Sequence, residues 1–88
     1  MLRGTTKTGF QFEIPEENLD NMELIDALSE ADQGNKLAVS RVCELLLGKS
    51  LKKALYDHVR VSDGRVPTEA LSSEILDIIM YKGESGKN

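Results

Sequence analysis

Hydrophobic and polar residues alternate near the start of the chain, where Phe10, Phe12 and Ile14 are separated by single polar residues. This two-residue period is typical of a β-strand with one buried face. Residues 7–9 before it have the composition of a turn, so the sequence predicts a β-hairpin over residues 2–14. Because an isolated hairpin is marginally stable in water, we expect its aromatic face to pack on helices, unless its open edge pairs with another chain.

From residue 20 onward the hydrophobic period changes to three and four residues, the spacing of amphipathic helices. The first helix is predicted over residues 20–32, with Asp20 as N-cap and Glu23 completing a capping box. Gly34 is suited to end this helix, and Asn35 to cap the next one. The residues predicted to form the buried stripe of this first helix are Leu24, Ile25, Leu28 and Ala31.

Three further helices are predicted, separated by glycine-containing turns. The second ends at Gly48 and is apolar on more than one face, which indicates the central helix of the core. The third runs from its N-cap Ser50 to about Arg60, and the last from Pro67 to Gly83. The residues expected to face the core from these last two helices are Leu51, Leu55, Val59, Leu71, Ile75, Ile78 and Ile79.

Together these elements predict a mainly α (α+β) fold, with an N-terminal β-hairpin packed on a compact bundle of about four short helices. The chain of 88 residues suits one domain, residues 1–83, followed by a polar tail, residues 84–88. No apolar run approaches the ~20 residues that cross a bilayer, and none resembles a signal peptide. With a single cysteine in addition, we expect a cytoplasmic protein that does not contact the membrane.

Charge divides the chain into an acidic first third and a basic middle. Residues 8–35 contain eight acids and no Lys or Arg, whereas residues 36–65 contain seven bases and three acids. Such runs usually solvate a surface and pair with each other. They can also steer a charged protein partner, including a second copy of the chain in a homo-oligomer. On that second interpretation the candidate partner-binding residues are Glu23, Asp26, Glu30, Lys49, Lys52 and Lys53.

Two short motifs suggest ligand binding but lack required residues. Residues 48–50, Gly-Lys-Ser, look like the end of a phosphate-binding loop, yet Cys43 occupies the position of its first glycine and a helix is expected before it. Residues 63–64, Asp-Gly, resemble the turn of a calcium-binding EF-hand, yet Ala70 occupies the position of its bidentate glutamate. We therefore expect no cofactor and no metal.

Cys43 and His58 are the remaining candidates for a nucleophile and its base. Cys43 is expected in the core, and burial in apolar surroundings raises the pKa of a thiol, which works against nucleophilic catalysis. The acids of the first helix are expected on an exposed face, without the cleft that acid–base catalysis requires. We predict that the protein is not an enzyme.

The helix–glycine–helix unit of residues 40–60 offers an alternative function, a small DNA-binding regulator of the helix-turn-helix type. Lys52 and Lys53 would then contact phosphates. However, Glu44 occupies a position where the motif requires a small residue, and the net charge of −4 disfavours nucleic acid as a partner. A protein-interaction module unrelated to either function is a further alternative.

The order of these features along nearly the whole chain resembles the small tail assembly chaperones of long-tailed, non-contractile phages and prophages of Gram-positive bacteria. The resemblance implies a non-catalytic cytoplasmic protein that binds the phage tape-measure protein, keeps it soluble and helps the tail-tube protein to assemble around it. It carries over no catalytic or binding residues. The matching segments are Gly9–Ile14, Leu19–Asp32, Gly34-Asn35, Leu45–Gly48, Leu55-Tyr56 and Asp63–Val66.

Such chaperones are often made in a second, longer form when ribosomes slip back one base near the end of the gene. The last three residues, Gly86-Lys87-Asn88, are compatible with a codon sequence on which both tRNAs can re-pair after such a shift. An ordinary polar tail is the simpler interpretation, and only the codons can distinguish the two.

Overall fold

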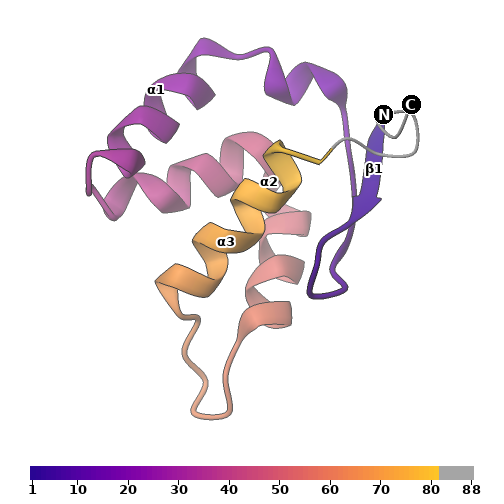
Figure 1. Cartoon of the computed structure of the whole chain (residues 1–88), viewed down its shortest axis with the longest axis vertical. Helices are drawn as coiled ribbons and strands as arrows, with labels where there is room; N and C mark the ends of the chain where they lie inside the picture. Colours follow the sequence, from indigo (N-terminus) through magenta and orange to yellow (C-terminus); the bar gives the residue numbers. More distant parts are fainter. Residues whose placement is uncertain (82–88) are drawn as a thin grey trace.

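The computed structural model describes residues 1–81, which form an N-terminal hairpin followed by a short 3-10 helix and three α-helices (Figure 1). The predicted mainly helical fold with an N-terminal hairpin is confirmed. Residues 82–88, which include Gly83 and the predicted tail and slippage residues, lie outside the described part. The elements are β1 (Leu2–Thr5), β2 (Gln11–Ile14), η1 (Glu16–Leu19), α1 (Met22–Asp32), α2 (Leu37–Val59) and α3 (Thr68–Ile79).

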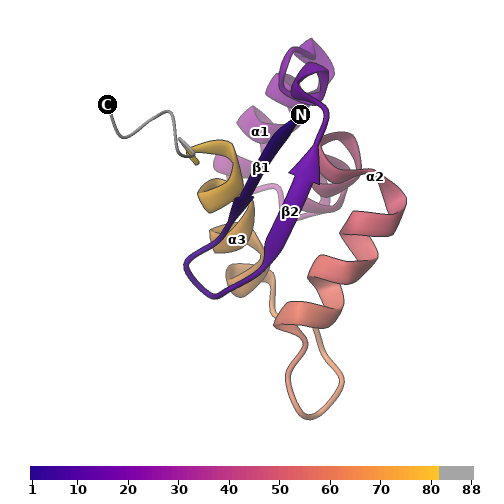
Figure 2. The ribbon, with the colours of Figure 1, turned by 90° about the vertical axis from the view of Figure 1, so that its right-hand side faces the viewer.

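The two strands of the hairpin are antiparallel, with Leu2 opposite Ile14 and Gly4 opposite Phe12. Figure 2 shows the hairpin in front of the helices. Phe10, Phe12 and Ile14 are all buried in the core, as the alternation predicts. The hairpin is therefore held by the helices that its apolar face covers.

The N-terminal end of α1 differs from the prediction. Asn21, not Asp20, is the N-cap, and its side-chain oxygen accepts a hydrogen bond from the backbone N–H of Glu23 at 3.0 Å. The short helix η1 brings the chain to Asp20, so that α1 starts one position later than expected. Asn and Asp cap helices about equally well, and the local sequence does not choose between them.

The second and third predicted helices are the two halves of one kinked helix, α2. Gly48 is the residue in α2 with non-helical dihedrals, at φ 78° and ψ 170°, which confirms the predicted break. The helix resumes directly after it, so Ser50 is not at a helix start. The described residues therefore contain three α-helices, whereas the prediction of about four counted the two halves of α2 separately.

The last helix begins at Thr68, one residue later than predicted, with Pro67 as its N-cap, and it ends at Ile79, earlier than the predicted end at Gly83. Leu71, Ile75 and Ile78 are buried in the core, as expected from their spacing. From the middle of the chain the core adds residues of both halves of α2: Ala38, Val39, Val42, Cys43, Leu46, Leu47 and Leu55.

Candidate functional site

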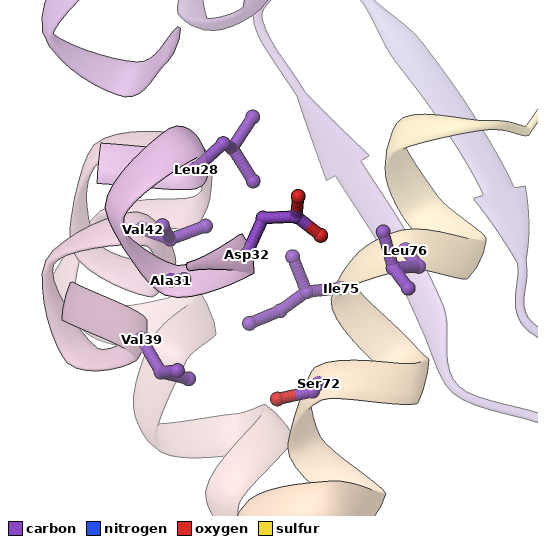
Figure 3. Close-up of a pocket in the computed structure, with 8 residues that line it drawn as sticks. All are labelled: Leu28, Ala31, Asp32, Val39, Val42, Ser72, Ile75 and Leu76. Carbon is purple, nitrogen blue, oxygen red and sulfur yellow. The ribbon is translucent and has the colours of Figure 1, made fainter. Parts of the chain in front are cut away.

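An apolar groove lies between the three helices. Both α1 and α3 pack against α2, and the first half of α2 lies between them (Figure 1). The space that remains has a volume of about 250 Å³ (Figure 3). The residues that line it are Leu28, Ala31 and Asp32 from α1, Val39 and Val42 from α2, and Ser72, Ile75 and Leu76 from α3.

The walls of the groove continue into exposed apolar side chains. Ile25, which the sequence places in the buried stripe of α1, is 47% exposed, while the unpredicted Ala27 is buried. Leu76 of α3 is 54% exposed, and Met80, the C-cap of this helix, is 71% exposed. Apolar surface of this kind beside a hollow is typical of an interaction site.

Two polar side chains lie within the groove. Asp32 is the last residue of α1, and Figure 3 shows its carboxylate directed toward Ile75 and Leu76 of α3. Ser72 contributes a hydroxyl group from the α3 wall. Within residues 1–81 the side chain of Asp32 makes no ion pair within 4.0 Å.

The acids singled out from the sequence lie elsewhere on α1. Glu23, Asp26 and Glu30 are all exposed, and none of them lines the groove. Glu23 lies 3.7 Å from Arg41 of α2, which is a weak pair between exposed groups. These three acids form a solvated face that is open to a partner but is separate from the apolar groove.

The predicted bases are brought together on the second half of α2. Lys49, Lys52 and Lys53 border a shallow hollow of about 240 Å³, together with Glu44, Tyr56 and Arg60. The Lys52 ammonium group lies 2.9 Å from the Ser40 hydroxyl and 5.6 Å from the centre of the Tyr56 ring. The kink at Gly48 makes the first of these contacts possible, because it turns the second half of α2 back toward the first.

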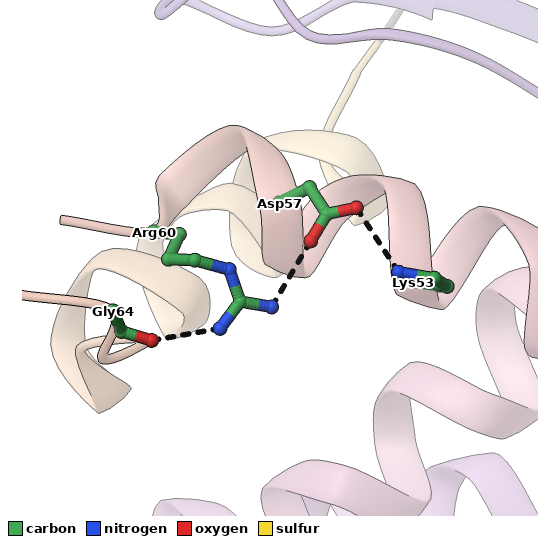
Figure 4. A network of polar contacts seen from close by, with 4 residues as sticks. All are labelled: Lys53, Asp57, Arg60 and Gly64. Atoms are coloured by element: carbon green, nitrogen blue, oxygen red, sulfur yellow. Dashed lines mark hydrogen bonds and ion pairs between the residues drawn. The ribbon is translucent and has the colours of Figure 1, made fainter. Parts of the chain in front are cut away.

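Part of the positive charge in this basic region is neutralised by one carboxylate, that of Asp57. The Asp57 carboxylate lies 3.0 Å from Arg60 and 3.3 Å from Lys53, and Arg60 also donates to the carbonyl oxygen of Gly64 at 2.7 Å (Figure 4). Hydrogen bonds from Arg60 and then Lys53 lower the pKa of Asp57. Moreover, a helix-turn-helix needs a turn of three to four residues, whereas only Gly48 leaves the helical conformation here. Both observations disfavour DNA binding.

The tip of the hairpin is fastened to α3 by hydrogen bonds that the sequence did not reveal. The Thr8 hydroxyl donates to Glu74 Oε2 at 2.7 Å, and the Lys7 backbone N–H donates to Asp77 Oδ2 at 2.7 Å. His58 Nε2 lies 2.9 Å from the Thr8 oxygen. Because Thr8 gives its single proton to Glu74, His58 is the donor in this contact and not the base that a nucleophilic hydroxyl requires.

Replacing Thr8 with valine is expected to lower the free energy of unfolding by about 1–3 kcal/mol. Glu74 is only 3% exposed, and its Oε1 has no partner among the described residues, so Thr8 supplies its one hydrogen bond there. Chemical denaturation followed by circular dichroism measures the change. Thr5→Val is the matched control, because Thr5 is an exposed strand residue without a side-chain hydrogen bond in residues 1–81. Equal effects of the two substitutions would contradict this role of Thr8.

Cys43 is fully buried, which confirms its predicted place in the core. Burial raises the pKa of its thiol from 9.0 to about 11, although the nearby Lys52 charge acts in the opposite direction. A thiol with this pKa is protonated at neutral pH and is a poor nucleophile. The polar partner of His58 is Thr8, so the structure gives no support to a Cys43–His58 catalytic pair.

The raised pKa of Cys43 predicts a specific loss of stability in alkaline solution. The unfolded chain loses the thiol proton near pH 9, while the folded protein keeps it to about pH 11. Ionisation of this thiol therefore leaves the free energy of unfolding unchanged below pH 9. Between pH 9 and pH 11 it lowers the free energy of unfolding, by at most about 1.4 kcal/mol for each pH unit. Denaturation curves of the native protein and of Cys43→Ala over this range should show a shallower decline in the variant. Parallel declines would contradict the assignment.

Within residues 1–81, no group of three or more His, Cys, Asp or Glu side chains is arranged to hold a metal ion. No helix in the same part of the chain is both long and apolar enough to span a bilayer. Comparisons with protein-family models, with curated proteins and with solved structures find no match to this chain.

Proposed function

We propose that this chain is a non-catalytic tail assembly chaperone of a long-tailed phage or prophage, which binds the tape-measure protein in the host cytoplasm and aids assembly of the tail tube. The observation that supports the proposal best is the apolar groove between α1, α2 and α3, with exposed Leu76 in its lining and half-exposed Ile25 one turn before Leu28 on α1. The order of features along the sequence, described above, supplies the link to phage tails.

An amphipathic helix is the client that suits this groove. Helix-in-groove binding requires an apolar channel between packed helices and apolar anchors at i, i+3, i+4 and i+7 of the bound segment. Leu28 and Ala31 of α1 can contact such anchors from one side and Leu76 of α3 from the other, because these lining side chains reach the surface. A tape-measure protein is expected to be long and helical, and would expose many such segments before the tube assembles around it.

Co-expression tests the proposal directly. The gene should lie between a tail-tube gene and a gene for a very long helical protein, and that long product should stay soluble only when this chain is present. A gene neighbourhood without tail genes, or a long product whose solubility does not depend on this chain, would overturn the proposal.

Binding of duplex DNA that weakens steeply with salt would instead support the alternative function, a small DNA-binding regulator.

A further inference from the structure

Asp32 places a single negative charge in the apolar groove. Among the eight residues that line the groove it is the only charged one, and within residues 1–81 it has no ion-pair partner. Asp32 is exposed to solvent, and the lining beside it, including Leu28 and Leu76, is apolar (Figure 3). An exposed ion pair adds little affinity, but a carboxylate at one fixed point of an apolar groove favours a partner with a cation at the matching position.

The position of Asp32 in α1 increases this negative potential. It is the last residue of the helix, where the helix dipole is negative, and the last turn of α1 contains no basic residue. A helix end usually carries Lys, Arg or His in such a place, so both the carboxylate and the helix end favour a cation supplied from outside α1. The groove is thus apolar along its length and negative at one point.

We infer that the groove selects a cationic amphipathic helix, in which one Lys or Arg next to the apolar face of the bound segment pairs with Asp32. The inference rests on the proposed function and specifies which segments of the client bind. The aliphatic part of the bound Lys or Arg would pack on Leu28 and Leu76, while its charged end reaches the carboxylate. The Ser72 hydroxyl on the opposite wall is available to accept a further hydrogen bond.

The spacing along α1 sets the register of the bound helix. Ile25 and Asp32 are two turns apart on the same side of α1, a separation of about 10 Å. The basic residue of the client should therefore lie about two turns from the apolar residue that packs on Ile25. A client segment needs at least three turns to make both contacts.

A second copy of this chain is a poorer occupant than a separate protein. The basic segment of the chain is the second half of α2, and the apolar side of that half is already used in the core, where Leu55 is fully buried. Within the described residues, this helix has no free apolar face to place in the groove of a neighbouring copy.

Two synthetic helical peptides test the inference. Both carry Leu at i, i+3, i+4 and i+7, and they differ only in having Lys or Gln two turns from the first Leu. Fluorescence anisotropy gives their dissociation constants for the native protein and for Asp32→Asn and Asp26→Asn. We expect the Lys peptide to bind the native protein about threefold more tightly than the Gln peptide, and Asp32→Asn to remove this preference without changing binding of the Gln peptide.

Asp26→Asn is the matched control, because it removes an acid from the exposed face of α1 that does not line the groove. An equal effect of both substitutions would show general charge attraction and overturn the inference. Equal binding of the two peptides to the native protein would also overturn it, while leaving the groove as a binding site. If neither peptide binds, the inference and the role of the groove fail together, whereas the co-expression result tests the chaperone function separately.

Discussion

Replacing Gly48 with valine is expected to lower the free energy of unfolding by about 3 kcal/mol or more. Gly48 has φ 78° and ψ 170°, a region of backbone conformation that is essentially restricted to glycine. Valine is β-branched and is especially poorly tolerated at positive φ. The space around the glycine is open, so the cost arises from the backbone and not from a clash. The loss is a large part of the ~5–15 kcal/mol that stabilises a typical domain.

Denaturation by urea measures this loss, and Ser50→Val provides the control. Ser50 is exposed and lies two residues further along α2, past the kink. The control substitution should cost well under 1 kcal/mol, since surface changes usually have small effects. If Gly48→Val is as stable as Ser50→Val, the kink is not a required feature of the fold. A variant in which α2 straightens should also lose the contact between Lys52 and Ser40.

The features that were predictable from the sequence depend on local physical rules. The alternation of Phe10, Phe12 and Ile14 located a strand and its buried face, because side chains of a strand alternate between two sides. Gly48 located the break in α2, because glycine is the residue that tolerates this conformation. Pro67 located the start of α3 for a similar reason, since proline has a fixed φ and no N–H to donate.

The errors arose where distant parts of the chain decide the outcome. The spacing of α1 allows either Ile25 or Ala27 to face inward, and packing against α2 selects Ala27. The groove could not be predicted for the same reason, because its walls come from three helices. Glu74 is buried beneath the tip of the hairpin. Its hydrogen-bond partner there, Thr8, is far from it in the sequence. The helical spacing places Glu74 on the buried face of α3, three residues after Leu71, but it does not identify the partner of the carboxylate.

The partner-binding residues predicted from charge remain a separate hypothesis. The sequence correctly indicated that the acids Glu23, Asp26 and Glu30 are exposed, but charge runs do not locate an apolar groove. The acid that does line the groove, Asp32, belongs to the same acidic segment and was not distinguished from the others. Its place at the end of the predicted helix, without a neighbouring base in the last turn, is the signal that could have identified it.

Replacing Ser72 with tryptophan is expected to weaken binding of a client helix by about 100-fold or more. Ser72 lies on the α3 wall, and a tryptophan side chain there would fill much of the 250 Å³ groove. The client would then lose its apolar contacts with the accessible part of the lining, such as Leu28 and Leu76, and two or three lost contacts of this kind correspond to about 3 kcal/mol. Anisotropy titration with helical segments of the tape-measure protein measures the effect.

The stability of the Ser72→Trp variant should be close to that of the native protein, because the indole covers apolar surface that is now exposed to water. Asp26→Trp is the matched control, since it adds the same side chain to the exposed acidic face of α1, outside the groove. The two variants also compare the two candidate surfaces. If Asp26→Trp abolishes client binding and Ser72→Trp does not, the acidic face predicted from the sequence is the binding site. The groove would then be a packing defect between α1 and α3 without a role in client recognition.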